Sequence, residues 1–207
     1  MPENSSRFKI IERYRITRKA PGTIRLWSLQ PLAIWQELQH SEKLWVKPES
    51  TDKDFQSAYR WMTQQMQERI TGYQGHYPWW AYPFQKPDLR CWNGHFFGDK
   101  GVRLELQLAS EKVLISDYET WHCVLNSCAL PLSPNDEAEE EISPPPGMHL
   151  LDCPFPTPAQ RKAIESWARI FDLGSLSANG WAANSLQACF EELNLKDVIT
   201  VEILDIR

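Results

Sequence analysis

The segment Val102–Leu108 constrains the fold of this chain most, because it alternates apolar and polar residues without a break. It reads Val-Arg-Leu-Glu-Leu-Gln-Leu. Successive side chains of a strand point to opposite sides of a sheet, so this pattern predicts a strand with one core-facing side. Arg103 and Glu105 share the other, polar side, where they can pair with each other or address a ligand together.

Helical and extended patterns interleave along the rest of the chain. Strands are predicted at 23–29, 113–115 and 198–206, and an edge strand or loop at 77–82, which contains one Pro and is followed by another. Helices are predicted at 53–70, 116–126, 157–171 and 179–193, and another begins at Gln30-Pro31. Residues 116–119 and 157–160 have capping-box sequences. Because regular β–α–β spacing is missing, we expect a compact single α+β domain with a mixed or antiparallel sheet flanked by helices.

Two segments carry most of the charge. Residues 1–22 hold six basic and two acidic residues, a net +4, and are predicted to be an N-terminal extension with a short strand or helix. Residues 131–157 hold six acidic residues and no Lys or Arg among many Pro, which predicts a loop or partly disordered insertion in a domain spanning 23–207. The alternative is an acidic arm that folds over the basic segment. Since the whole chain carries −5, a dedicated duplex-DNA binder is not expected.

Cysteine and hydropathy patterns favour a cytoplasmic protein. The five Cys are odd in number and irregularly spaced, which is typical of a reducing compartment. We expect neither a membrane span nor a signal peptide, since no apolar run has the required length. Cys123 and Cys128 lie near His122, but a single C-x4-C pair lacks the usual zinc spacing, so no metal site is predicted. The sequence motifs of kinases, P-loop NTPases, Rossmann dehydrogenases and zincins are absent.

The strongest candidate for ligand binding is an aromatic cluster between Tyr73 and Phe84, followed by Lys86 and Arg90. Flat rings beside cations suit stacking on a base or nicotinamide, with the cations compensating a phosphate. We therefore expect Trp80, Tyr82, Lys86 and Arg90 to bind ligand. The rings can equally pack onto the core. Trp79 and Trp80 are neighbours, so a strand directs only one of them inward.

A second candidate follows the predicted strand at 113–115. Asp117 lies at a helix N-terminus, which attracts anions, and Trp121 is its i+4 neighbour. His122 is a candidate general acid or base, since an imidazole can both donate and accept a proton. The alternatives are a structural histidine on a helix and, for Arg103 and Glu105, an exposed ion pair of the sheet.

Several short motifs occur in one order along the chain. They are Leu26–Pro31 with Trp35, Ala58–Met62, Lys86–Arg90, Arg103–Glu105, and Leu114–Asp117 with Trp121-His122 and Leu125-Asn126. Together they resemble a bacterial family of unknown function, number 3841 among such domains, over residues 23–130, near 181–193 and in the final strand. The resemblance implies a compact bacterial domain and no particular reaction. The chain departs from the family in its basic extension, its acidic insertion and a missing Gly near Ser41.

The leading hypothesis is a Trp-lined polar cleft that binds a nucleotide-like ligand, with NAD as the candidate cofactor. By analogy with ADP-ribosyltransferase-like domains, Arg25 or Arg90 would hold a pyrophosphate and Glu105 or Glu202 would be the carboxylate. Such a transferase would be a toxin or phage-defence effector. Its catalytic residues would be Glu105, Asp117 and His122. Its ligand contacts would include Arg25, Arg103 and Trp121. The rival is a non-catalytic module that docks a partner protein through its aromatic surface. A catalytic site should gather the charged candidates, which are Arg90, Arg103, Glu105, Asp117 and His122.

Overall fold

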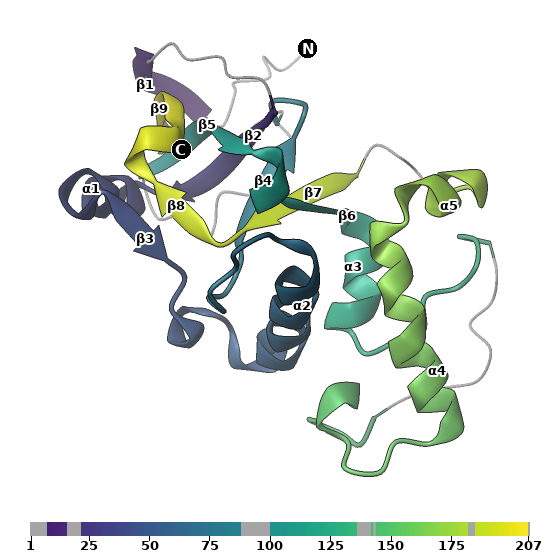
Figure 1. Cartoon of the computed structure of the whole chain (residues 1–207). Coiled ribbons are helices and arrows are strands. Elements are labelled where there is room, and N and C mark those ends of the chain that lie inside the picture. The colour runs from purple at the N-terminus through teal and green to yellow at the C-terminus, as the bar shows by residue number, and fades with distance from the viewer. Residues whose placement is uncertain are drawn as a thin grey trace, which may run out of the picture. The chain divides into compact units, whose positions relative to one another are not determined.

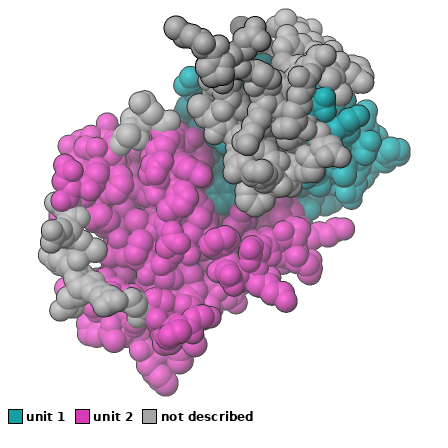
Figure 2. All heavy atoms as spheres, turned by 180° about the vertical axis from the view of Figure 1, so that it is seen from behind, with its two compact units in different colours: residues 1–45, 79–113, 188–207 teal, residues 46–78, 114–187 magenta. Residues whose placement is uncertain are grey.

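The computed structural model describes residues 8–15, 22–87, 100–135, 142, 144–181 and 185–206, and only the backbone for 8–15 and 206. Within these ranges the chain is of the α+β class, as predicted (Figure 1). It divides into two compact units, coloured separately in Figure 2. Unit 1 comprises residues 1–45, 79–113 and 188–207, and unit 2 comprises residues 46–78 and 114–187.

The core of unit 1 is an antiparallel sheet. Six strands among the described residues hydrogen bond in the order β1-β9-β5-β2-β4-β7. Their bounds are β1 Phe8–Arg15, β2 Thr23–Pro31, β4 Trp79–Pro83, β5 Lys100–Ala109, β7 Leu186–Phe190 and β9 Val198–Ile206. The predicted strands at 23–29, 102–108 and 198–206 are thus confirmed. The segment 8–15, predicted as a strand or a helix within a basic extension, is a strand paired with β9.

Unit 1 also contains one helix and a small second sheet. The helix α1, Leu32–Ser41, follows β2 directly, with Pro31 as its N-cap and Leu38 fully buried. Strand β3, Lys43–Trp45, pairs antiparallel with β8, Glu192–Asn194. Short 3-10 turns at Ser110–Lys112 and Leu195–Asp197 precede the next strands.

The strand β4 corrects the expectation of an edge strand or loop at 77–82. It lies between β2 and β7, inside the sheet. The two prolines are compatible with this position because Pro78 precedes the strand and Pro83 is its last residue. Neither therefore removes a donor from the middle of the hydrogen-bonded ladder.

Unit 2 is mainly helical. Its helices are α2 Gln56–Arg69, α3 Tyr118–Leu125, α4 Pro158–Ser166 and α5 Leu173–Ala178, with 3-10 turns at Pro48–Ser50, Lys53–Phe55, Leu150–Asp152 and Trp167–Phe171. The capping box of Thr157 and Gln160 is confirmed, since each side chain binds the backbone N–H of the other residue. None of the helices in the described part of the chain has the length and apolar character that a membrane crossing requires.

Two predictions for unit 2 are wrong. The helix α3 is capped by Asp117, whose carboxylate accepts from the Thr120 N–H, and not by Ser116 with Glu119. Ser116 is a buried residue within β6, Leu114–Asp117, and its hydroxyl accepts a hydrogen bond from Gln187. The helix predicted at 179–193 does not form in the described residues: α5 ends at Ala178, and this range contains the strand β7 and most of β8.

An aromatic cluster fills the core of unit 2. The Trp61 ring stacks on Trp121 with 6.3 Å between centroids and meets Trp167 edge-on at 6.0 Å. Phe171 stacks on Trp61 at 5.9 Å. Leu150, from the segment predicted to be a loop or disordered insertion, is fully buried, so the described end of that segment belongs to the packed unit.

Candidate functional site

One face of the unit 1 sheet gathers most of the predicted ligand-binding residues. Cross-strand partners in an antiparallel ladder share a face. In β2, Leu29 lies opposite Arg103 and Trp27 opposite Glu105, and Arg103 lies opposite Glu202 of β9. Trp27 also lies opposite Tyr82 of β4. We call this side the polar face, and its residues used below are Arg25, Trp27, Trp80, Tyr82, Arg103, Glu105 and Glu202.

A buried carboxylate, that of Glu202, joins two cations on the polar face. Glu202 is 3% exposed, and its Oε1 accepts a hydrogen bond from Lys86 Nζ at 2.8 Å. Its Oε2 accepts from Arg103 Nε at 2.7 Å and also from Arg103 Nη2. Arg103 Nη1 donates to the carbonyl of Pro87 at 3.1 Å. The segment after β4 therefore runs to the polar face, where hydrogen bonds from Lys86 to Glu202 and from Arg103 to Pro87 hold it.

The electrostatic environment keeps Glu202 ionised. Burial would raise the pKa of Glu202, but hydrogen bonds and charge from Lys86 and Arg103 outweigh burial and hold this pKa below its usual range. The carboxylate carries one negative charge against two positive charges, so this group has a net positive charge. Removing one partner of an ion pair this deeply buried costs stability, because the other charge remains buried without compensation.

A second, more exposed ion pair lies beside the aromatic residues. Arg25 Nε is 3.2 Å from Glu105 Oε1, and the two side chains are 49% and 19% exposed. Arg103 and Glu105 share a face, as predicted, but each has its ion-pair partner on another strand. Arg103 lies directly opposite Glu202, whereas Arg25 is a diagonal neighbour of Glu105, a separation that its long side chain can span.

The aromatic residues of β4 alternate as the sequence predicts. Trp79 is buried, and its indole N–H donates to the Leu44 carbonyl at 3.2 Å. Trp80, half-buried, points to the polar face together with Tyr82, which is 40% exposed. Phe84 follows the strand with 63% exposure and a positive φ of 63°. A bulky residue rarely adopts that backbone conformation, so the turn holds its ring outward at some cost.

Asp117 and His122 lie in unit 2, and each hydrogen bonds with other residues of that unit. Asp117 is buried; besides capping α3, its Oδ2 accepts a hydrogen bond from Ser185 at 3.0 Å. His122 Nδ1 lies 2.9 Å from the carbonyl of Tyr118, which can only accept, so Nδ1 carries the proton. The Tyr118 ring meets the His122 ring edge-on at 4.7 Å. The contacts of Asp117 hold the start of α3.

The remaining predicted residues are Trp121 and Arg90. Trp121 is buried in the aromatic cluster of unit 2, between Trp61 and the edge of Tyr59, and its ring is used for packing. Arg90 lies outside the described residues. Arg103 and Glu105 share the polar face, whereas Asp117 and His122 belong to the other unit.

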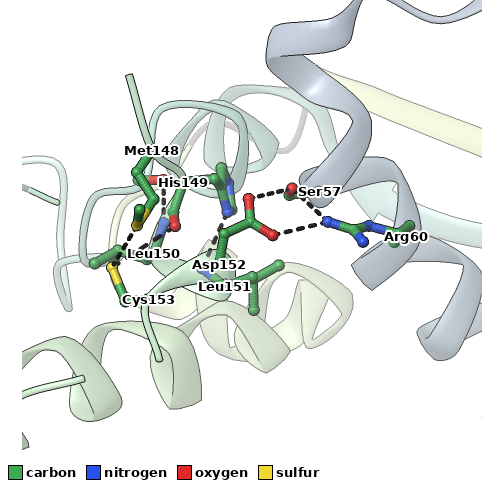
Figure 3. Close-up of polar contacts among 9 residues, drawn as sticks. Ser57, Arg60, Met148, His149, Leu150, Leu151, Asp152 and Cys153 are labelled. Carbon is green, nitrogen blue, oxygen red and sulfur yellow. Dashed lines mark hydrogen bonds and ion pairs between the residues drawn. The ribbon is translucent and has the colours of Figure 1, made fainter. Parts of the chain in front are cut away.

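Sequence reasoning missed a polar cluster in unit 2 (Figure 3). Ser57 Oγ donates to Asp152 Oδ2 at 2.5 Å, and Arg60 Nη2 donates to Asp152 Oδ1 and to Ser57 Oγ, both at 2.8 Å. The cluster ties the Leu150–Asp152 turn to α2. Asp152 is 92 residues from Arg60, so no local pattern reveals the pair.

His149 holds the same turn from its other side. Its Nε2 lies 2.7 Å from the Val124 carbonyl, and its Nδ1 accepts from the Leu151 N–H at 3.2 Å. Within the described residues, no group of three or more His, Cys, Asp or Glu side chains is placed to hold a metal ion.

The comparisons with known proteins identify the family. Residues 25–199 match the family described as "Domain of unknown function (DUF3841)", so the chain belongs to that family, as the ordered motifs predicted. Neither a curated protein nor a solved structure matches the chain.

Proposed function

We propose that the polar face of unit 1 binds an anionic, nucleotide-like ligand. The observation that carries the proposal is the shared face itself: two partly exposed cations, Arg25 and Lys86, lie on or reach the side that presents Trp80 and Tyr82. Rings beside cations suit a base and a phosphate. Three cations and two carboxylates in the two ion-pair groups leave a net +1, which favours an anion.

Each cation has a distinct part in this proposal. Arg25 is half-exposed, and a guanidinium can bind a phosphate with two parallel hydrogen bonds. Lys86 is 43% exposed and binds Glu202, whose second oxygen is already held by Arg103. A phosphate can therefore take a share of the Lys86 charge while Glu202 keeps its Arg103 partner. Tyr82 would stack on the base beside Trp27.

Thermal shift tests the binding proposal. The chain is melted with NAD, ADP and inorganic phosphate, and a ligand present at about 100 times its Kd should add about 2.7 kcal/mol, or about 5–10 °C. Arg25→Ala should abolish the shift. Arg60→Ala is the matched control, because Arg60 is also a partly exposed arginine paired with a carboxylate. Absence of any shift, or equal loss in both variants, would contradict ligand binding at the polar face.

ADP-ribosyl transfer from NAD, in a toxin or phage-defence role, is the most specific version of the proposal. Glu105 is its carboxylate, because it lies beside Trp27 and Arg25 and is partly accessible. The test is nicotinamide release from NAD, with Glu105→Gln expected to stop release while the NAD-induced shift remains. Binding without release, in wild type, would leave a binding module and eliminate the transferase.

A second candidate function is a protein-docking module, favoured by the exposed and strained Phe84 beside Tyr82. A photoreactive residue at position 84 should cross-link one partner, whereas the same residue at the exposed position 55 should not. If nucleotides raise the melting temperature in an Arg25-dependent way and no cross-link forms, ligand binding is favoured over protein docking.

A further inference from the structure

The end of α3 brings two cysteines together. Ser127 has a φ of 56°, the left-handed conformation that ends many helices. The Cys128 N–H donates to the Cys123 carbonyl at 2.9 Å, and the Ser127 N–H donates to the Val124 carbonyl at 3.3 Å. These two bonds define a Schellman motif, in which the side chains at the positions of Cys123 and Cys128 commonly contact each other. The C-x4-C spacing, which is not that of a zinc site, thus places Cys123 and Cys128 at the two positions of this motif that contact each other.

The surrounding contacts hold this loop in place. The Trp167 indole N–H donates to the Cys128 carbonyl at 2.7 Å, and Ser127 Oγ accepts from the Leu150 N–H at 3.0 Å. Cys128 is exposed, whereas Cys123 is half-buried. Cys128 is therefore the more accessible of the two cysteines to a small reagent.

The two sulfurs are chemically unequal. A hydrogen bond from the Cys123 thiol lowers the pKa of Cys128 to about 7, although burial opposes this effect. The same contact, with burial and the Cys128 charge, raises the pKa of Cys123. Arg169 partly offsets that rise, and Asp117 adds to it. The thiolate is the nucleophilic form of cysteine, so Cys128 is the reactive member of the pair near neutral pH.

We propose that Cys123 and Cys128 form a redox-sensitive pair that hydroperoxides oxidise to a disulfide. The Cys128 thiolate attacks one peroxide oxygen, the O–O bond breaks, and Cys128 becomes a sulfenic acid while the other oxygen leaves and is protonated to water. The Cys123 sulfur then attacks the Cys128 sulfur, the S–O bond breaks, and the departing oxygen leaves as water with the Cys123 proton. Two thiols lose two electrons, and one hydrogen peroxide becomes two waters.

Peptide mapping of the unmodified chain tests the product. Cleavage before Asp releases residues 117–135, which contain Cys123 and Cys128 and no other cysteine. After treatment with hydrogen peroxide this peptide should lose two hydrogens and regain them with a thiol reductant. A peptide that keeps both thiols, or oxidises only to sulfinic acid, would overturn the proposal.

Alkylation kinetics test the unequal roles. The rate of iodoacetamide reaction at Cys128 should rise with a midpoint near pH 7. In Cys123→Ala, which removes the donor, the midpoint should move toward ~8.5, and the rate at pH 7 should fall about threefold, since the smaller thiolate fraction is partly offset by greater nucleophilicity. Peroxide should then leave a sulfenic acid on Cys128 that dimedone traps. Cys153, half-buried in the same unit, is the control, and equal rates at Cys128 and Cys153 would also overturn the proposal.

Discussion

The polar face of unit 1 and the aromatic core of unit 2 use the chain's tryptophans and charges in opposite ways. In unit 2, Trp61, Trp121 and Trp167 pack against one another, and all three are buried. On the polar face Trp27 is buried as well, but Trp80 is half-buried and Tyr82 is 40% exposed, and both ion-pair groups there are partly exposed. The tryptophans of the unit 2 cluster are used for packing, whereas Trp80 and Tyr82 of the polar face are accessible enough for recognition. Mutations in the unit 2 core should therefore lower stability, whereas mutations of exposed residues on the polar face should lower ligand binding.

The largest effect on stability is expected from Trp61→Ala. Trp61 is at the centre of the cluster, in contact with Trp121, Trp167 and Phe171. Truncating a buried Trp removes apolar burial and leaves a cavity, at about 3–5 kcal/mol. Urea unfolding followed by circular dichroism measures the loss. Phe155→Ala is the control, because Phe155 is 92% exposed in the same unit and should change stability by less than ~0.5 kcal/mol.

Glu202→Ala should cost somewhat less, about 3 kcal/mol, measured in the same way. The substitution leaves the buried Arg103 without its carboxylate, which is the costly way to break a buried ion pair. The Pro87 carbonyl still accepts from Arg103, which limits the loss. If Glu202→Ala is neutral while Trp61→Ala is not, the buried ion pair contributes nothing to holding the sheet.

The contribution of Glu202 should depend on pH. Its pKa is lower in the folded chain than the ~4.3 of an unfolded glutamate, so the folded state favours the ionised form. That stabilisation is complete above the unfolded pKa and disappears as the pH falls through the folded pKa. The stability difference between wild type and Glu202→Gln should be constant from pH 5 to 7 and should shrink below about pH 4. A difference that grows with acidity would contradict the sign of this shift.

The smallest effect on stability is expected from Arg25→Ala. Its ion pair with Glu105 is half-exposed, and such pairs contribute about 0–1 kcal/mol. The measurement is the urea midpoint in the absence of ligand. A small change here, together with loss of the nucleotide-induced thermal shift, would show that Arg25 serves binding. A loss comparable to that of Glu202→Ala would make Arg25 part of the structural support of the sheet.

Local patterns predicted the elements whose causes are local. The alternation at 102–108 predicted β5, and the capping-box sequence Thr157–Gln160 predicted the start of α4. Both patterns depend on residues only a few positions apart. The strand at 186–190 was mistaken for a helix. Its partner β4 is about a hundred residues away, and tertiary pairing overrides weak local preference.

Several residues of the candidate site were named from the sequence, whereas their pairing was not. The sequence identified Arg25, Arg103 and Glu105, but their partners depend on sheet register, which no single segment contains. Glu202 was considered only by analogy, and its burial between two cations became visible in the structure. Trp121 was taken as a ligand contact because it adjoins charged residues, yet its ring belongs to the core of unit 2.

The order of strands in unit 1 has a consequence for synthesis on the ribosome. β5 hydrogen bonds to β2 on one edge and to β9 on the other, and β9 is made almost ninety residues after β5 ends. All residues of unit 2 emerge before β9 does. During that interval one edge of the most regular strand in the chain has no partner, and such an edge can pair with the strand of another nascent chain. We expect slower elongation before residue 198 to increase aggregation of this protein, and chaperones that cover the β5 edge to reduce it.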